Sequence, residues 1–181
     1  MNGPQTYQLA TLGVAATAAA FDWRKGRIPN WLTLGALVAA LPLHAWLTTP
    51  GPDTSPLDGA KWSLIGATFC TVPCLVAWGF GWMAGGDLKL IAAMGALSGL
   101  SLGLEAVFFA FLCAGSFVLF RLAWDGTLLR AVSDEATTVV ARTLYRKNQR
   151  LLPREAKTLR FGPFALAGAA LSLVLHGGFA S

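Results

Sequence analysis

Long apolar runs, separated by short polar stretches, restrict this chain to a helical fold that spans a membrane. A membrane-spanning helix needs about 20 mostly apolar residues, with a range of about 17–25. Only 13% of the 181 residues are charged, whereas a soluble domain carries about 25%. We therefore predict an all-α integral membrane protein, a single six-helix domain over residues 1–181. The six predicted transmembrane helices are 7–21, 31–47, 62–83, 88–102, 104–124 and 161–179.

The Lys and Arg residues predict the orientation of these spans. Three basic residues lie in loop 23–30 and eight in loop 125–160, whereas loop 48–61 has only Lys61 at its edge. Cytoplasmic loops carry an excess of Lys and Arg, so we expect both basic loops in the cytoplasm and both termini outside. No basic residue precedes the first apolar run, which is the reverse of a cleavable signal peptide.

Two aspartates stand at the ends of predicted spans. Asp22 ends the first span and Asp87 begins the fourth, so the predicted topology places both on the cytoplasmic side. A carboxylate in hydrocarbon costs about 2.5 kcal/mol or more at the bilayer centre, and less near its edge. Paired carboxyl groups can hydrolyse a peptide, because one takes a proton from water and the other donates one to the carbonyl. We interpret Asp22 and Asp87 as a candidate catalytic dyad.

Helix dipoles suggest different roles for the two aspartates. Asp22 lies at the C-terminal end of a span, where negative charge is disfavoured, and Asp87 at an N-terminal end, where it is favoured. Our hypothesis is that Asp87 is the base and Asp22 holds the proton. Arg24 and Lys25 oppose it by favouring negative charge on Asp22, and a close pair titrates as a unit.

Residues beside the aspartates are candidates for binding substrate or shaping the site. Gly85 and Gly86 permit a tight backbone approach or a positive φ before Asp87. Pro29 and Asn30 begin the second span, where Pro is pre-organised for a helix, and their loop could shape the cleft. Lys89 could orient substrate, or it could simply extend to the membrane interface.

Each aspartate also has an ordinary structural interpretation. Asp22 could be an interface residue paired with Arg24 or Lys25. Asp87 could cap the N-terminus of the fourth span, a position that Asp favours. The agreement of both positions with the predicted topology favours the catalytic interpretation.

The cysteines do not predict a zinc site. Cys70, Cys74 and Cys113 lie inside apolar runs and are interpreted as small packing residues, without the polar support of a zinc site. His44 and His176 are expected towards the outer side, away from both aspartates.

A basic amphipathic helix is predicted over 132–152, with arginines at intervals of four. This segment could lie on anionic membrane lipid, at about 1 kcal/mol per basic residue, or it could be a solvated loop helix. Nucleic acid is not an expected partner, because no aromatic residues are interleaved for stacking.

Three segments of the chain resemble the motifs of type IV prepilin peptidases, and they extend from the first predicted span to the last. The three segments are Asp22 with RKGRIPN at 24–30, GGDLKL at 85–90 and RFGPFALAG at 160–168.

The resemblance implies a six-span aspartic endopeptidase of the GxGD type, with Asp22 and Asp87 catalytic and no cofactor. Such an enzyme cuts the basic leader from prepilin-like precursors at the cytoplasmic face of the bacterial inner membrane. The short loop 23–30 has no room for the methyltransferase insert of larger members, so no methylation is expected. The size resembles the peptidases of tight-adherence pilus systems and the archaeal preflagellin peptidases. Ala84 replaces the first glycine of GxGD, which restricts the backbone there.

Two functions of other classes compete with the peptidase. A non-catalytic membrane assembly factor could hold pilin subunits and use the aspartates to grip a basic leader. A proton-coupled transporter would need polar residues through to the outer face, and the predicted spans show no such chain.

Overall fold

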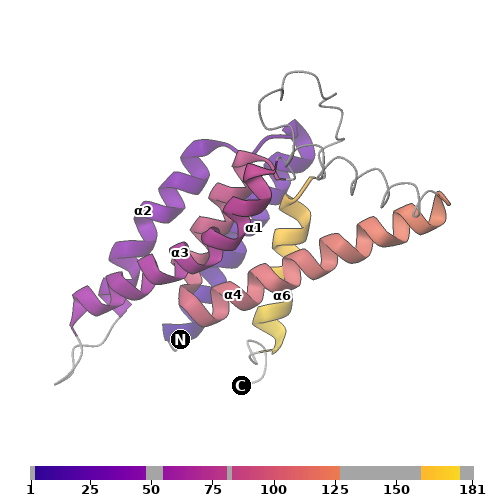
Figure 1. The fold of residues 1–181 in the computed structure, drawn as a ribbon. Coiled ribbons are helices and arrows are strands. Elements are labelled where there is room, and N and C mark those ends of the chain that lie inside the picture. Colours follow the sequence, from indigo (N-terminus) through magenta and orange to yellow (C-terminus); the bar gives the residue numbers. More distant parts are fainter. Residues whose placement is uncertain (1–2, 48–54, 81–82, 127–159, 176–181) are drawn as a thin grey trace. The chain divides into compact units, whose positions relative to one another are not determined.

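The computed structural model describes residues 3–47, 55–80, 83–126 and 160–175, and within these ranges the fold is all-helical. Three helices are long and apolar enough to cross a membrane, namely α2, most of α3, and α4, and α6 is a shorter apolar helix. These findings confirm an all-helical chain suited to a membrane, while the six-span topology stays a prediction. The helices are α1 (Gly3–Lys25), α2 (Asn30–Leu47), α3 (Pro56–Gly79), α4 (Gly85–Trp124) and α6 (Gly162–Leu175) (Figure 1).

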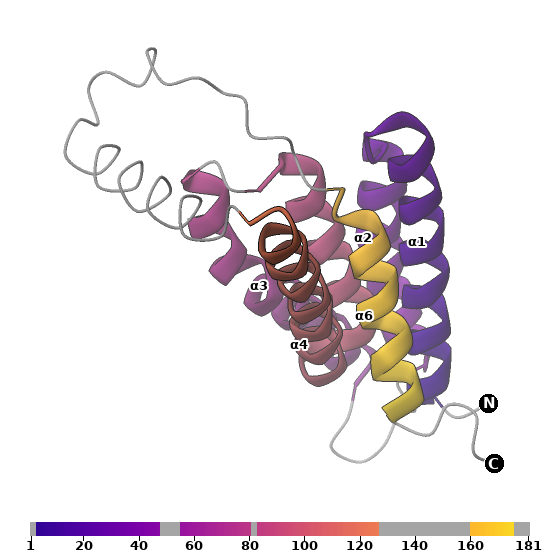
Figure 2. The same ribbon diagram turned by 90° about the vertical axis from the view of Figure 1, so that its right-hand side faces the viewer.

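The chain divides into two compact units. The first holds α1, α2, α3, the part of α4 up to Cys113, and α6, and all the candidate site residues belong to it. Within this unit α6 packs along α1, as Figure 2 shows, and α2 packs along α3. The second unit contains the rest of α4, where the rings of Phe120 and Trp124 lie 6.0 Å apart. The predicted amphipathic segment 132–152 lies outside the described residues.

Gly99 divides α4 into two helical segments. Its φ of 74° and ψ of −171° are not helical and suit glycine. A Cβ on Gly103 would lie 3.0 Å from the Cα of Gly95. In an uninterrupted helix those residues would be about 12 Å apart, so the chain reverses between them. The tight turn predicted between the fourth and fifth spans near Gly103 is therefore found at Gly99.

Polar side chains from three other helices secure this reversal. A helix end leaves carbonyl groups without intrahelical partners, and within a membrane these groups need partners from the protein. The side chains come from α1, α2 and α3, so the turn in α4 is connected to each of these three helices. The contacts are Ser63 Oγ donating to the Ala96 carbonyl at 2.8 Å, His44 Nε2 at 3.0 Å from the Leu97 carbonyl oxygen, and Thr11 Oγ1 at 2.7 Å from Ser98 Oγ.

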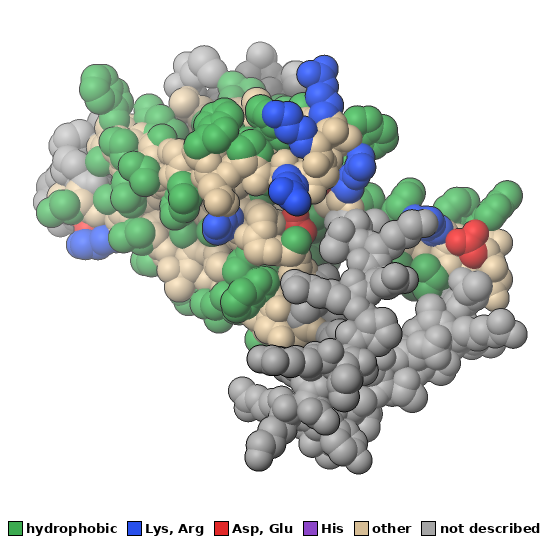
Figure 3. Space-filling view, turned by 90° about the horizontal axis from the view of Figure 1, so that it is seen from above, with side chains coloured by type: hydrophobic (Ala, Val, Ile, Leu, Met, Phe, Trp, Pro, Cys, Tyr) green, Lys and Arg blue, Asp and Glu red, His purple; other side chains and the backbone are tan. Residues whose placement is uncertain are grey.

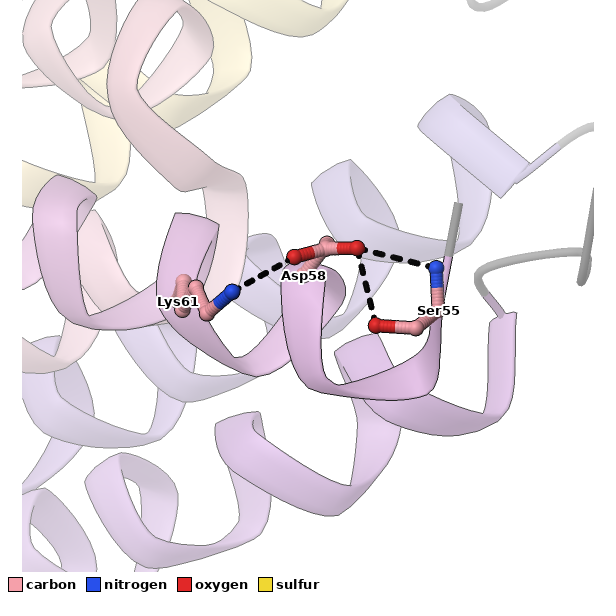
Figure 4. Close-up of polar contacts among 3 residues, drawn as sticks. All are labelled: Ser55, Asp58 and Lys61. Carbon is pink, nitrogen blue, oxygen red and sulfur yellow. Dashed lines mark hydrogen bonds and ion pairs between the residues drawn. The ribbon is translucent and has the colours of Figure 1, made fainter. Parts of the chain in front are cut away.

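Helix α3 begins six residues earlier than the predicted third span. Asp58 Oδ2 accepts hydrogen bonds from the backbone N–H of Ser55 at 2.9 Å and from its hydroxyl at 2.8 Å (Figure 4). Lys61 Nζ donates to Asp58 Oδ1 at 2.7 Å. Serine before the helix, Pro56 in the first turn and an acid three residues after the cap form a strong helix start. Asp58 and Lys61, predicted in loop 48–61, therefore belong to the helix.

Large apolar side chains lie on the outside of the helices. Trp31 and Trp46, predicted at membrane boundaries, are 67% and 87% exposed. Hydrophobic side chains also cover much of the face seen in Figure 3, around a group of Lys and Arg side chains. An apolar exterior of this kind suits contact with lipid rather than water.

Candidate active site

Asp22 lies in the last turn of α1 and is only 5% exposed. The helix ends because Gly26, with φ of 61°, adopts a left-handed conformation that glycine reaches without steric cost. The Gly26 N–H donates to the Asp22 carbonyl oxygen at 2.9 Å, as in a common C-terminal helix cap. This cap fixes the backbone of Asp22 at the end of α1.

The side chain of Asp22 is held by the start of α6. The N–H of Gly162, the first residue of α6, donates to Asp22 Oδ2 at 3.0 Å in a buried contact. The first N–H groups of a helix have no intrahelical partner and form the positive end of its dipole. The carboxyl group therefore satisfies a free donor of α6, and α6 fixes one oxygen of Asp22.

Arg160 makes a second connection between the same two helix ends. Its Nη1 donates to the carbonyl oxygen of Trp23 at 2.8 Å. Gly162 and Arg160 were noticed in the sequence only as members of the segment 160–168, and neither was predicted to contact Asp22. The available signals were Pro163, which marks a helix start, and the predicted cytoplasmic position of that start.

Asp87 is the third residue of α4 and is half-buried. The Ala84 carbonyl accepts the N–H of Asp87 at 3.1 Å and that of Leu88 at 3.3 Å, so Ala84 occupies the N-cap position. The alternative that Asp87 caps the helix is therefore wrong. The carboxyl groups of Asp22 and Asp87 lie close enough for their charges to interact. The structure thus brings together the two aspartates that the sequence singled out.

Gly85 and Gly86 do not behave as expected. Neither has a positive φ, because both are already part of the helix. A Cβ on Gly85 would lie 3.7 Å from Trp78 Nε1, and one on Gly86 would lie 3.8 Å from Ile28 Cβ, which are ordinary contacts. The expectation of a tight approach or a positive φ at these residues is therefore wrong. Among the described residues no non-glycine residue has a positive φ, so the backbone also accommodates Ala84.

Lys89 and Asn30 connect the start of α4 to the start of α2. Lys89 Nζ donates to Asn30 Oδ1 at 3.0 Å, on the exposed surface. Pro29 directly precedes α2, and its carbonyl accepts the N–H of Leu32 at 3.1 Å. Pro29 thus marks the helix start as predicted, and Lys89 has a defined partner two residues after Asp87.

Among the residues that the structure describes, Asp22 has no basic partner within ion-pair distance. Within the described residues, ion pairs join only Lys61 to Asp58 and Arg121 to Asp125. The alternative that Asp22 is paired with Arg24 or Lys25 is therefore not what the structure shows.

The candidate metal-ligating side chains of the described residues are scattered. Within residues 3–47, 55–80, 83–126 and 160–175, no three His, Cys, Asp or Glu residues are grouped so that they could hold a metal ion. Cys70 and Cys74 are buried free cysteines, as the apolar runs around them suggest.

Comparison with known proteins supports a specific family. The model of the type IV leader peptidase family matches residues 9–119, which is more than half of the chain. The matched range includes Asp22 and Asp87 and ends before α6. Searches of curated proteins and of solved structures found no match.

Proposed function

Because the chain belongs to the type IV leader peptidase family, we propose that it is a membrane aspartic endopeptidase that removes the basic leader from type IV prepilin-like precursors. The observation that carries this proposal is the buried Asp22, which lies near Asp87 and has no basic partner among the described residues. A buried carboxyl group without a basic partner is costly, so a site that keeps one usually has a use for it.

The proposed reaction is hydrolysis of one peptide bond by water. The ionised carboxylate takes a proton from water as the oxygen attacks the scissile carbonyl, and the protonated carboxyl group donates to the carbonyl oxygen. When the tetrahedral intermediate collapses, the C–N bond breaks and the carboxyl group that took the proton from water gives it to the leaving amine. The other carboxylate takes a hydroxyl proton of the intermediate as the carbonyl re-forms, which restores the dyad. Gly162 occupies Oδ2 of Asp22, so Oδ1 is the oxygen left to exchange protons.

The assignment of these two roles remains a prediction. The dipole of α1 favours a proton on Asp22 and the dipole of α4 favours charge on Asp87. The positive end of α6 lies beside Asp22, which the sequence did not predict. It favours negative charge on Asp22 and so opposes this assignment. We propose Asp87 as the base on the dipoles of α1 and α4, which act in the same direction, against the single opposing contribution of α6.

The proposed location is the cytoplasmic face of the bacterial inner membrane, with both termini outside. The basic loop 23–30, directly after Asp22, supports this orientation. The same loop is too short for a methyltransferase insert, so cleavage is proposed to be the sole activity. Prepilin recognition in this scheme involves the membrane-facing side of Asp22 and Asp87, with Gly85, Gly86, Lys89, Pro29 and Asn30 shaping the site.

The test is leader cleavage by purified protein in liposomes, with the product masses as readout. Asp22→Asn and Asp87→Asn should each abolish cleavage of a prepilin with a basic leader, while both variants still insert. Asp125→Asn, in the second unit, is the matched control and should keep full activity. Cleavage by either dyad variant would refute the proposal. Binding of the precursor by wild-type protein without any released leader would instead support the assembly factor.

A further inference from the structure

We propose that Gly162 is a positioning residue, and that its N–H together with the absence of a side chain holds Asp22 in the geometry needed to activate water. This inference rests on the proposed function. It concerns α6, which lies outside the range matched by the family model.

The fit around Gly162 leaves no space for a methyl group. A Cβ built there would lie 2.9 Å from Asp22 Cβ, 3.0 Å from Ala19 Cα and 3.0 Å from Asp22 Oδ2. Two of these three atoms lie on or next to the α1 backbone and cannot swing aside. A larger residue would therefore separate α6 from α1 and lengthen the 3.0 Å hydrogen bond to Asp22.

The residues before Gly162 fix the direction of its N–H. The Phe161 carbonyl accepts the N–H groups of Phe164 and Ala165, each at 3.0 Å, so Phe161 is the N-cap of α6. Its ring is buried and lies 5.3 Å from the ring of Phe111. The helix start is thereby anchored in the core, and the Gly162 N–H is aimed by a rigid element rather than by a loop.

Small residues on both helices permit this close approach. Ala15, Ala18 and Ala19 of α1 are buried, as are Ala165 and Ala169 of α6. Helices within membranes pack closely where such residues meet, and Figure 2 shows α1 and α6 side by side. The contact between Gly162 and Asp22 is therefore the end of a continuous close interface.

The consequence for catalysis is one of geometry. A carboxyl group held at Oδ2 has restricted rotation, so Oδ1 is confined as well. Catalytic groups must be held within about 0.5 Å of their productive positions, and a displacement of about 1 Å can reduce the rate about 100-fold. Gly162 touches neither water nor peptide in this scheme and acts through Asp22.

The first experiment compares Gly162→Ala with Gly13→Ala in prepilin cleavage. Gly13 lies in α1 with nothing within 4 Å of a built Cβ, so the control adds the same methyl group without a contact. Gly162→Ala should lower kcat about 10- to 100-fold with little change in KM, at equal amounts of folded protein, and Gly13→Ala should match the wild type. A wild-type kcat for Gly162→Ala would overturn the inference.

A second experiment needs no substitution at Gly162, and so remains decisive if that variant does not fold. The method is NMR on protein in which Phe carbonyls carry ¹³C and Gly nitrogens carry ¹⁵N. This labelling selects the amides of the two Phe-Gly pairs of the chain, at 80–81 and 161–162. The variant Gly81→Ala removes one of the two signals, so the other belongs to Gly162. The Gly162 amide proton should change its chemical shift in Asp22→Asn, because this substitution replaces the group whose oxygen accepts the hydrogen bond. A Gly162 amide resonance that is the same in Asp22→Asn and in the wild type would contradict the hydrogen bond.

The two proposals fail separately. Cleavage by Asp22→Asn would refute the proposed peptidase itself. The positioning role alone would be refuted by a different set of results. In that set Asp22→Asn and Asp87→Asn are inactive, Gly162→Ala is fully active, and the Gly162 amide resonance is unchanged by Asp22→Asn.

Discussion

Replacing Gly99 with alanine tests the reversal of α4, on which the arrangement of the first unit depends. At φ of 74° and ψ of −171°, Gly99 occupies a backbone region that is essentially limited to glycine. The nearest atom to a built Cβ is His44 Cε1 at 3.8 Å, an ordinary contact, so the cost arises from the backbone and not from crowding. Such strain amounts to about 1–3 kcal/mol.

The expected result is a free energy of unfolding lower by about 1–3 kcal/mol, which corresponds to an unfolding constant larger by about 5- to 150-fold. Reversible unfolding in mixed detergent micelles, followed by tryptophan fluorescence, measures this quantity. Gly13→Ala is the matched control, since Gly13 is helical and uncrowded and should tolerate alanine without loss of stability. Equal stability of Gly99→Ala and Gly13→Ala would show that the chain does not reverse at Gly99.

Two further predictions concern single hydrogen bonds. Ser63→Ala removes the donor to the Ala96 carbonyl and should lower the free energy of unfolding by about 0.6–1.7 kcal/mol. The control is Ser101→Ala, which changes an exposed serine and should leave the free energy of unfolding unchanged. Equal free energies of unfolding for the two variants in the same assay would contradict the role of Ser63. Lys89→Met breaks an exposed bond to Asn30, so stability should change by less than about 0.5 kcal/mol, while kcat for leader cleavage should fall several-fold because the start of α4 loses its connection to α2. Asn30→Ala should lower kcat similarly, and effects that add in the double variant would show that the two residues act separately.

The sequence predicted those features of the fold that depend on local composition. Long apolar runs predicted helices suited to a membrane, and α2 at Asn30–Leu47 nearly coincides with the predicted span 31–47. The need to reverse direction between two apolar runs predicted a tight turn, but only the backbone conformation identified Gly99 rather than Gly103. The start of α3 was missed because Ser55 and Asp58 lie in a polar stretch rich in Pro and Gly, which suggests a loop unless the capping pattern is weighed.

The candidate site was predicted only in part, for the same physical reason. Asp22 and Asp87 were visible because a carboxyl group beside an apolar run is costly and therefore conspicuous. The role of Gly162 was not visible, since a glycine at a helix start carries no sign of which helix end it contacts 140 residues away. Gly85 and Gly86 showed the opposite error, because glycines can be helical and need not mark an unusual backbone.

The bond between Asp22 and Gly162 also joins two parts of the chain that are synthesised far apart in time. They are separated by 140 residues, so ribosomes that add about 5–20 residues per second produce them roughly 7–28 s apart. Once Asp87 has been made, and until Gly162 follows 75 residues later, the nascent polypeptide contains both acidic groups but lacks the amide that orients Asp22. In the proposed peptidase, the orientation of Asp22 is therefore completed late in biosynthesis, after α6 has been made and has packed against α1.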